Sequence, residues 1–265
     1  MLILSNVEKT FNTGTVNEKK ALRGISLTLK DGDFVTVIGG NGAGKSTMLN
    51  MIAGVYPIDK GKIILNGENI SRWPEYKRAR FLGRVFQDPM MGTAATMEIQ
   101  ENMALAYRRG LKRTLNWSIT KKEKERYYEQ LKMLDLGLEN RMTSKVGLLS
   151  GGQRQALTLL MASLRKPELL LLDEHTAALD PKTAAKVLEI TEKLIKEQKL
   201  TAMMITHNMK DAIRYGNRLI MMNDGQIIYD VSGEEKKNLQ VSDLLKKFEQ
   251  ASGQEFANDR MMLGN

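Results

Sequence analysis

A glycine-rich stretch, residues 39–47, has the residue types and spacing to hold phosphate groups. It reads Gly-Gly-Asn-Gly-Ala-Gly-Lys-Ser-Thr and fits the pattern G-x-x-x-x-G-K-[ST] between an apolar strand candidate, 34–38, and a helix candidate, 46–53. Its glycines let backbone N–H groups point at phosphate oxygens, and the helix start favours negative charge. The pattern predicts that Lys45 reaches the β- and γ-phosphates of a nucleotide and that Ser46 offers a hydroxyl to Mg²⁺.

Two acidic residues could supply the matching metal and base chemistry. Asp173-Glu174 follows the apolar run 169–172, which reads as a buried strand. Asp173 would hold Mg²⁺ through water, and Glu174 would orient or deprotonate an attacking water. Successive strand residues point to opposite faces, so we expect the two acids to divide these roles. Taken alone, an acidic pair at a strand end is also consistent with a helix cap or a loop.

A second glycine-rich helix start, Leu149-Ser150-Gly151-Gly152-Gln153, precedes the helix candidate 153–164. Its amides and the Ser150 hydroxyl could bind an anion at the positive end of the helix. No lysine stands where Lys45 stands in the first loop. Such a site suits a phosphate whose charge is already largely neutralised by lysine and magnesium.

Antiparallel pairing is expected near the N-terminus and a parallel sheet after it. Residues 2–7 and 22–29 read as strands, and Asn66-Gly67 and Asp224-Gly225 are hairpin-turn signals. Strand candidates then alternate with helices, which indicates an α/β fold with a mostly parallel sheet. These later strand candidates cover residues 84–86, 169–173 and 201–206.

The helical regions are expected in three places. Residues 88–165 lack strong strand signals and should form a helical subdomain inserted into the sheet. Asp180 can cap the next helix, and Pro181 suits its first position. The segment after residue 231 is short and ends in a helix candidate, 241–251, so we expect no added regulatory domain. The chain is therefore predicted to be a single domain, 1–265.

Composition limits the class of protein. The 265 residues are 42% hydrophobic, enough for a sizeable core, and no internal repeat suggests a duplicated domain. The absence of cysteine rules out disulfides and thiolate metal sites. The N-terminus lacks signal-peptide features and the longest apolar run is too short to cross a bilayer, so we expect a soluble chain. The 17 methionines, including Met90-Met91, Met203-Met204 and Met221-Met222, are interpreted as adaptable core filling.

The net charge of +9 is concentrated in one segment. Residues 108–126 hold eight basic side chains and two acidic ones, a net charge of +6. A solvated helix face is the first interpretation, a surface facing anionic lipid is the second, and nucleic acid comes last. The basic residues are Arg108, Arg109, Lys112, Arg113, Lys121, Lys122, Lys124 and Arg126.

Together, the loop at 39–47 and the motif at 149–153 resemble the ATPase subunit of an ABC transporter, and the resemblance covers nearly the whole chain. It implies a P-loop NTPase core of the ABC type that sandwiches two ATP molecules between two chains, with Mg²⁺. In that arrangement the motif at 149–153 meets the γ-phosphate of ATP held by the facing subunit. One chain alone should then be nearly inactive.

The resemblance also assigns roles to residues outside the two glycine-rich motifs. Gln87 matches the glutamine that senses Mg²⁺ and the attacking water, and His207 matches the histidine that contacts the γ-phosphate. Phe11 lies where an aromatic ring stacks on adenine, although a lone phenylalanine is also consistent with a core position. Asp180, in Ala178-Leu179-Asp180, matches the aspartate that links the two active sites across a dimer. The helix-cap role of Asp180 is compatible with this.

One residue departs from the family pattern. His175 follows Asp173-Glu174, where the family most often has proline. We interpret it as a hydrogen-bonded loop residue rather than a catalytic group. Because histidine titrates near neutrality and Glu174 is its neighbour, it could also add pH sensitivity near pH 7.

The resemblance is strongest to bacterial importers, so we expect an ATPase at the cytoplasmic face of the membrane. Its partners would be a second ATPase subunit, permease subunits whose coupling helices meet 88–97, and an extracytoplasmic substrate-binding protein. The substrate subgroup suggested is aromatic or other amino acids. The alternatives are an exporter or lipoprotein-release ATPase, or a soluble ABC ATPase acting on nucleic acid or ribosomes. The predicted catalytic residues are Lys45, Gln87, Glu174 and His207, the nucleotide-binding residues are Phe11, Gly39, Asn41, Gly42, Ala43, Gly44, Lys45, Ser46, Thr47, Ser150, Gly151, Gly152, Gln153 and Asp180, and the Mg²⁺ ligands are Ser46, Gln87 and Asp173.

Overall fold

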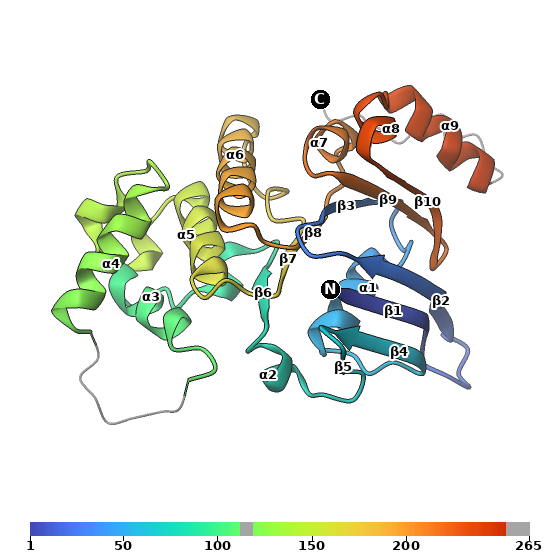
Figure 1. The fold of residues 1–265 in the computed structure, drawn as a ribbon, viewed down its shortest axis with the longest axis horizontal. Helices are drawn as coiled ribbons and strands as arrows, with labels where there is room; N and C mark the ends of the chain where they lie inside the picture. The colour runs from blue at the N-terminus through green and yellow to red at the C-terminus, as the bar shows by residue number, and fades with distance from the viewer. Residues whose placement is uncertain (112–118, 253–265) are drawn as a thin grey trace. The chain divides into compact units, whose positions relative to one another are not determined.

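The computed structural model describes residues 1–111 and 119–252 (Figure 1). Contacts between residues divide the chain into two compact units. The first unit joins Met1–Arg78 to Leu200–Asn265, and the second unit is Ala79–Lys199. The loop at 39–47 belongs to the first unit and the motif at 149–153 to the second.

An antiparallel sheet in the first unit has the strand order β2-β1-β4-β5. Strands β1 and β2 are longer than expected because their pairing continues past bulges to Phe11, which lies opposite Lys19. The predicted hairpin at Asn66-Gly67 joins β4 to β5, and both turn residues have the positive φ angles, 48° and 82°, that a tight two-residue turn requires. The strands are β1 Leu2–Phe11, β2 Lys19–Leu29, β4 Lys60–Leu65 and β5 Glu68–Asn69.

A second set of strands in the first unit follows the order β10-β9-β3-β8. Strand β3, Phe34–Ile38, is buried along its whole length and runs parallel to both β8, Ala202–Ile205, and β9, Arg218–Asn223. Strand β10, Gln226–Ser232, returns antiparallel to β9 through the predicted Asp224-Gly225 turn. Continuous burial of β3 explains why four of its five residues are apolar, and the hydroxyl of buried Thr36 donates to the carbonyl of Ala212 at 2.9 Å.

Helix α2, Glu75–Arg78, ends in Arg78, whose guanidinium is buried at the end of helix α1, Lys45–Ala53. Its Nη1 atom donates to the carbonyl oxygens of Met51 and Ile52, at 2.6 and 3.0 Å, in the last turn of that helix. Its Nε and Nη2 atoms donate to the carbonyls of Trp73 and Ser71, at 2.9 and 3.0 Å. Burial lowers the pKa of Arg78 to about 10. The cation therefore supplies donors to carbonyls in the last turn of α1, where intrahelical donors run out.

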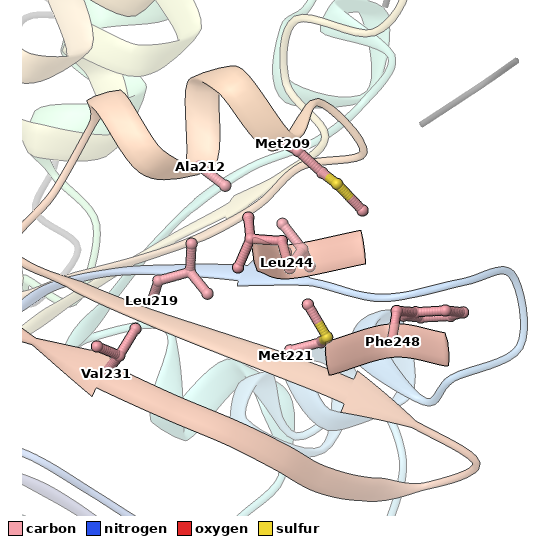
Figure 2. Close-up of a cluster of buried hydrophobic side chains, with 8 residues drawn as sticks. Met209, Ala212, Leu219, Met221, Val231, Leu244 and Phe248 are labelled. Carbon is pink, nitrogen blue, oxygen red and sulfur yellow. The ribbon is translucent and has the colours of Figure 1, made fainter. Parts of the chain in front are cut away.

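The helices of the first unit that follow β8 cover a buried cluster of eight apolar side chains (Figure 2). Helix α7, Met209–Arg214, and the C-terminal helix α9, Val241–Ser252, both contribute to it, and α8, Gly233–Lys237, lies between them in the chain. The cluster consists of Ile38, Met209, Ala212, Leu219, Met221, Val231, Leu244 and Phe248.

The second unit contains two parallel strands and most of the longer helices. Its described residues between 86 and 168 form helices and turns, with one isolated β-bridge between Glu98 and Lys145. None of the described helices is long and apolar enough to span a membrane. The elements are β6 Leu82–Val85, η1 Pro89–Gly92, α3 Ile99–Tyr107, α4 Lys121–Lys132, η2 Leu138–Arg141, η3 Val146–Leu148, α5 Gly151–Ser163, β7 Leu169–Asp173 and α6 Pro181–Gln198.

The methionine pairs behave differently from one another. Met203-Met204 and Met221-Met222 lie in β8 and β9 and are buried, as expected for core filling. Met90-Met91 lies in η1 and is exposed, with 45% and 69% of the two residues accessible. The interpretation of Met90-Met91 as core was wrong, because this pair occupies a short surface turn rather than a strand.

Candidate active site

The loop at 39–47 has a backbone that its glycines alone make possible. Gly39, Gly42 and Gly44 have φ angles of 152°, 80° and 99°, in the region that side chains disfavour. A Cβ atom on Gly39 would also lie 2.2 Å from the carbonyl oxygen of Met222. Helix α1 begins directly after Gly44. The N–H groups of the loop and of the first helical turn are therefore adjacent, and together they suit the binding of an anion.

Other walls of the loop are formed by residues that are distant in sequence. The Cβ position of Gly40 lies 3.3 Å from Cζ of Phe248, and that of Gly42 lies 3.3 Å from Nζ of Lys19. Neither Lys19 nor Phe248 was expected from the sequence. No local pattern marks either one, because both approach the loop through tertiary packing. Lys19 adds a second ammonium group beside a loop suited to phosphate.

Lys45 lies where a phosphate-binding cation must lie. It is buried, and its Nζ atom donates to the carbonyl oxygens of Gly39 and Gly40, at 2.8 and 3.2 Å. These contacts hold the ammonium group against the loop itself. The charge is thus placed in advance at the centre of the loop, with little side-chain freedom left to lose when an anion binds.

His207 emerges at the same edge of the sheet as the glycine loop. In the parallel pairing of β3 with β8, Val37 lies opposite Ile205, and the N–H of Thr206 donates to the carbonyl of Val37 at 3.1 Å. Gly39 and His207 therefore follow neighbouring strands at their carboxyl ends, where ligands bind in such sheets. Asn208 then caps α7 by accepting from the N–H of Lys210 at 2.9 Å.

Phe11 is partly buried at the end of β1 rather than in the core. Its ring meets Tyr56 edge-on, with centroids 5.2 Å apart, and Nζ of Lys9 lies 5.6 Å from its centroid. Lys9 in turn pairs with Asp59 at 2.8 Å. Phe11 lies opposite Lys19 in the pairing of β1 with β2, and directly opposed residues share a face of the sheet.

In the second unit the parallel register places Gln87 and the acidic pair at one edge. Val85 of β6 lies opposite Leu172 of β7, so Gln87 and Asp173 both follow at the carboxyl ends of these strands. Glu174 has a φ of 47°, a left-handed conformation that turns the chain away from β7. The structure therefore brings these three side chains to one edge of the strand pair.

Two residues that the sequence did not single out support this edge. Arg84 lies with Nη2 3.7 Å from Oδ2 of Asp173, which places a cation beside the acid expected to serve Mg²⁺. The buried side chain of Gln155 donates from Nε2 to the carbonyl of Phe86 at 3.1 Å, directly before Gln87. Arg84 lies in β6 and Asp173 in the neighbouring strand β7, and no local sequence pattern predicts an ion pair between two strands.

The motif at 149–153 forms a capped helix start. The hydroxyl of Ser150 accepts from the N–H of Gln153 at 3.3 Å, and the Gln153 side chain accepts from the N–H of Ser150 at 3.2 Å. Gly152 packs so closely against helix α6 that a Cβ atom there would lie 2.1 Å from Cγ2 of Thr183. This glycine thus has a packing role besides any role in binding.

Asp180 caps α6 as predicted. Its Oδ1 atom accepts from the N–H of Thr183 at 3.1 Å, and Pro181 occupies the first position of the helix. Hydrogen bonding from the side chain of Thr183, and then from its N–H, lowers the pKa of Asp180. The Cβ position of Gly151 lies 3.3 Å from Cδ2 of Leu179. The structure therefore brings the 149–153 motif and the 178–180 segment together, although about 25 residues separate them.

His175 corrects one of the sequence-based expectations. It is buried, and its Nε2 atom lies 3.0 Å from Oγ1 of Thr191, whose hydroxyl donates to the carbonyl of Val187 at 2.8 Å. Thr191 has one hydroxyl proton, so Nε2 of His175 must be the donor to it. Burial lowers the pKa of His175 to about 4. The hydrogen-bonded role is confirmed, whereas sensitivity near neutral pH is wrong because the side chain stays uncharged there.

Part of the basic segment is used within the protein. Arg108 pairs with Glu123 at 3.1 Å, and Arg109 donates to the carbonyl of Ala162 at 3.3 Å. Lys121, Lys122 and Lys124 are exposed, which fits a solvated helix face and leaves the lipid interpretation open. Arg126 hydrogen-bonds Tyr107, and Lys112 and Arg113 lie outside the described residues.

The donor chemistry of the predicted Mg²⁺ ligands fits that ion. Ser46, Gln87 and Asp173 offer a hydroxyl, an amide oxygen and a carboxylate. Mg²⁺ takes oxygen ligands and is commonly held by one or two carboxylates together with substrate phosphates. Across residues 1–111 and 119–252, no group of three or more His, Cys, Asp and Glu side chains could hold a metal by itself. A cation accompanying a nucleotide fits this sparse donor set.

Several known proteins are similar to this chain in sequence. Residues 22–177 match the ABC transporter family. A tyrosine transport ATP-binding protein of Clostridioides difficile (strain R20291) is 44% identical over 252 residues, which are 95% of this chain and 100% of that protein. A phosphonates import ATP-binding protein of Lactobacillus delbrueckii subsp. bulgaricus is 33% identical, covering 87% of this chain and 89% of that protein.

Solved structures share the fold. A dimeric ATP-binding cassette in a post-hydrolysis state, bound to ADP and Pi, superposes with a TM-score of 0.74 at 30% identity, covering 88% of this chain and 98% of that one. An ATP-binding cassette in its ADP conformation gives 0.77 at 28% identity, covering 96% and 99%. The expected fold class, an ABC ATPase with antiparallel and parallel sheets, is confirmed. The chain belongs to the ABC transporter family and is one of its ATP-binding ATPase proteins.

Proposed function

We propose that this chain binds ATP with Mg²⁺ and hydrolyses it as one of two ATPase subunits that power solute import through permease subunits. The observation that carries the proposal is the loop at 39–47, whose glycine backbone surrounds the buried ammonium of Lys45 at the start of α1. That arrangement suits a polyphosphate. As in the rest of this family, the whole chain, 1–265, would act as one nucleotide-binding domain, and residues 88–165 would be its helical subdomain.

Each side chain at the two sheet edges takes one task in this proposal. Lys45 and the loop amides bind the β- and γ-phosphates, while Ser46 and Asp173 serve Mg²⁺ together with Gln87. Glu174 orients the attacking water, and His207 contacts the γ-phosphate. Phe11 stacks on adenine, which fits its partly buried ring at the end of β1. The remaining contacts to nucleotide come from Gly39, Asn41, Gly42, Ala43, Gly44, Thr47, Ser150, Gly151, Gly152, Gln153 and Asp180.

Two chains are needed because the motif at 149–153 is suited to a phosphate that another loop holds. Its helix start offers amides and the Ser150 hydroxyl without a lysine in the motif. A site of this kind adds to an already neutralised γ-phosphate but would hold free ATP weakly. The relative solved with ADP and Pi is a dimer, which supports this reading. We infer a homodimer.

The partner surface proposed for the permease lies at η1. Met90 and Met91 are exposed there, and Leu148 is 71% exposed. Arg154 connects η1 with η3, the turn that holds Leu148. Its Nη2 atom donates to the carbonyl of Gly147 at 3.1 Å, and its Nη1 atom contacts the sulfur of Met90. Exposed apolar side chains held in a fixed arrangement are typical of a protein-binding surface. A permease partner at this surface supports our proposal that the chain acts at the cytoplasmic face of the membrane.

We propose that the imported substrate is an aromatic amino acid. It is supported by the tyrosine transport protein at 44% identity over nearly the full length of both chains. An extracytoplasmic binding protein would deliver that substrate to the permease. Uptake assays with the co-expressed permease would test this, and export of the amino acid would contradict it.

The ATPase proposal is tested with Glu174→Gln. Without its carboxylate the variant should still bind ATP, hydrolyse it at least about a hundredfold more slowly, and accumulate as an ATP-bound dimer. Light scattering coupled to size exclusion measures the dimer. Glu189→Gln, an exposed glutamate on α6, is the matched control and should behave as wild type. A monomer in ATP, with unchanged turnover, would contradict the proposal.

Ser150→Arg tests whether the motif acts on the facing subunit. The larger, charged side chain should leave ADP binding by the single chain unchanged while it abolishes ATP-dependent dimerisation and hydrolysis. Loss of ADP binding would instead mean that the motif binds nucleotide within its own chain.

A further inference from the structure

Phe248 of the C-terminal helix α9 lies against the phosphate loop. The Cβ position of Gly40 is 3.3 Å from Cζ of its ring. We propose that Phe248 is a positioning residue of the nucleotide site, whose ring forms the wall that holds Gly40 and sets the course of the loop. The inference rests on the proposed binding of nucleotide by that loop. It assigns α9 a role in nucleotide affinity.

Gly40 differs from its neighbours in the reason why it is glycine. Gly39 has a φ of 152° and faces the Met222 carbonyl at 2.2 Å, so its backbone and its surroundings both demand glycine. Gly40 does not have a φ in the positive region that disfavours side chains. Its nearest neighbour at the Cβ position is the ring of Phe248. Space beside that ring, rather than backbone conformation, therefore accounts for glycine at this position.

The ring itself is fixed by the core. Phe248 is 3% exposed and belongs to the apolar cluster of Figure 2, together with Leu244 one helical turn earlier on α9. The same cluster contains Ile38, the last residue before the loop, and Met209, two residues after His207. A side chain packed on all sides transmits position because close-packed cores resist small displacements. Helix α9 thus braces the strand end from which the loop departs.

The consequence concerns the fraction of time the loop spends in its binding conformation. Amides converge on phosphate only in that conformation, and the apparent affinity falls in proportion to its population. Removing the ring opens space behind Gly40 and lets the loop occupy other conformations. We expect ADP binding to weaken about three- to tenfold. Helix α9 lies about 200 residues from the loop in sequence, so a local change there would act through this contact.

The test compares two substitutions on the same face of α9. Phe248→Leu removes the ring, while Leu244→Val removes one methylene from a side chain in the same cluster. Leu244, unlike Phe248, is not among the nearest neighbours of the Cβ positions of the loop glycines. Both purified variants are measured for ADP affinity by calorimetry and for Tm. We expect a similar loss of Tm in both and weaker ADP binding only in Phe248→Leu. Equal ADP affinities in the two variants would overturn the inference.

A double-mutant cycle makes the contact itself measurable. Gly40→Ala should weaken ADP binding, because its methyl group meets the ring at 3.3 Å. In the Phe248→Leu background the same methyl group has room, so the penalty should shrink and the two effects should not add. Strict additivity would overturn the proposed contact.

A Lys45→Ala control separates this inference from the proposed function. If the wild-type chain binds ADP no better than Lys45→Ala, the loop does not bind nucleotide and the proposed function fails. If the wild type binds ADP and Lys45→Ala does not, the comparison of Phe248→Leu with Leu244→Val decides the inference alone.

Discussion

Replacing Arg78 by methionine would remove a buried cation that holds the end of the loop-bearing helix α1. Methionine has a side chain of similar length, but its introduction removes one donor from each of four carbonyl oxygens, those of Met51, Ile52, Ser71 and Trp73. The loss should appear as a lower free energy of unfolding rather than as an altered fold.

Two opposing terms set the size of the effect. Burial lowers the pKa of Arg78 to about 10, so the folded protein bears a desolvation cost of about 3 kcal/mol that methionine would relieve. Against this, each hydrogen bond from a charged donor contributes about 1.5–3 kcal/mol, and four such bonds are lost. Four bonds contribute at least about 6 kcal/mol, which exceeds the relief, so a net destabilisation of at least about 3 kcal/mol is expected.

The assay is urea unfolding followed by circular dichroism, with Tm as a second measure. A loss of this size corresponds to a decrease in Tm of about 10 °C for a chain of this length. Arg72→Met is the matched control, since Arg72 is exposed in the same loop region and should change stability by less than about 0.5 kcal/mol. A loss below about 1 kcal/mol in Arg78→Met would refute the reasoning.

Three further outcomes are expected. Because the pKa of His175 is about 4 in the folded chain and about 6.5 when unfolded, the unfolded state binds the extra proton as pH falls through this window. Going from pH 7.5 to pH 5 should therefore cost the wild type about 2 kcal/mol more stability than it costs His175→Gln, and equal losses in urea titrations would contradict this. Gly152→Ala should cost about 1–3 kcal/mol by overpacking against Thr183, and Thr183→Ser should recover most of it in thermal melts, because the serine lacks the methyl group 2.1 Å from the added Cβ. Lys19→Gln should weaken ADP binding about threefold at low salt and less at high salt, while Lys20→Gln, whose ammonium group pairs with Glu8 at 3.3 Å, should not; salt-independent effects would argue against a charge contact.

Local signals predicted much of the fold. The strands at 34–38 and 169–173 have the predicted residues, and the Asn66-Gly67 and Asp224-Gly225 turns lie where they were expected. These features depend on neighbours in the chain, such as continuous apolar runs and residues that tolerate positive φ. The end of β1 was missed, since pairing continues through bulges to Phe11, and bulges leave no clear mark in an apolar pattern.

The supports of the candidate site were not predictable in this way. Arg84 reaches Asp173 across two strands, Gln155 reaches the Phe86 carbonyl from a helix, and Phe248 reaches Gly40 from the C-terminal helix. Each contact joins residues that are about 70 or more positions apart. Sequence periodicity indicates which face of an element is buried but not which distant side chain it meets. His175 illustrates the same limit, because its burial, and hence its lowered pKa, comes from packing against α6.

The position of β3 between two strands from the far end of the chain has a consequence for synthesis. β3 ends at residue 38, whereas its neighbours β8 and β9 begin at residues 202 and 218. At about 5–20 residues per second, a ribosome needs about 10–40 seconds to supply them after β3 has been made. During that interval the four apolar residues of β3 and Thr36 lack their sheet partners, and the phosphate loop lacks the Met222 carbonyl and the Phe248 ring that border it. The growing chain therefore carries an unpaired buried strand and an incompletely walled loop until β9 and α9 have left the ribosome.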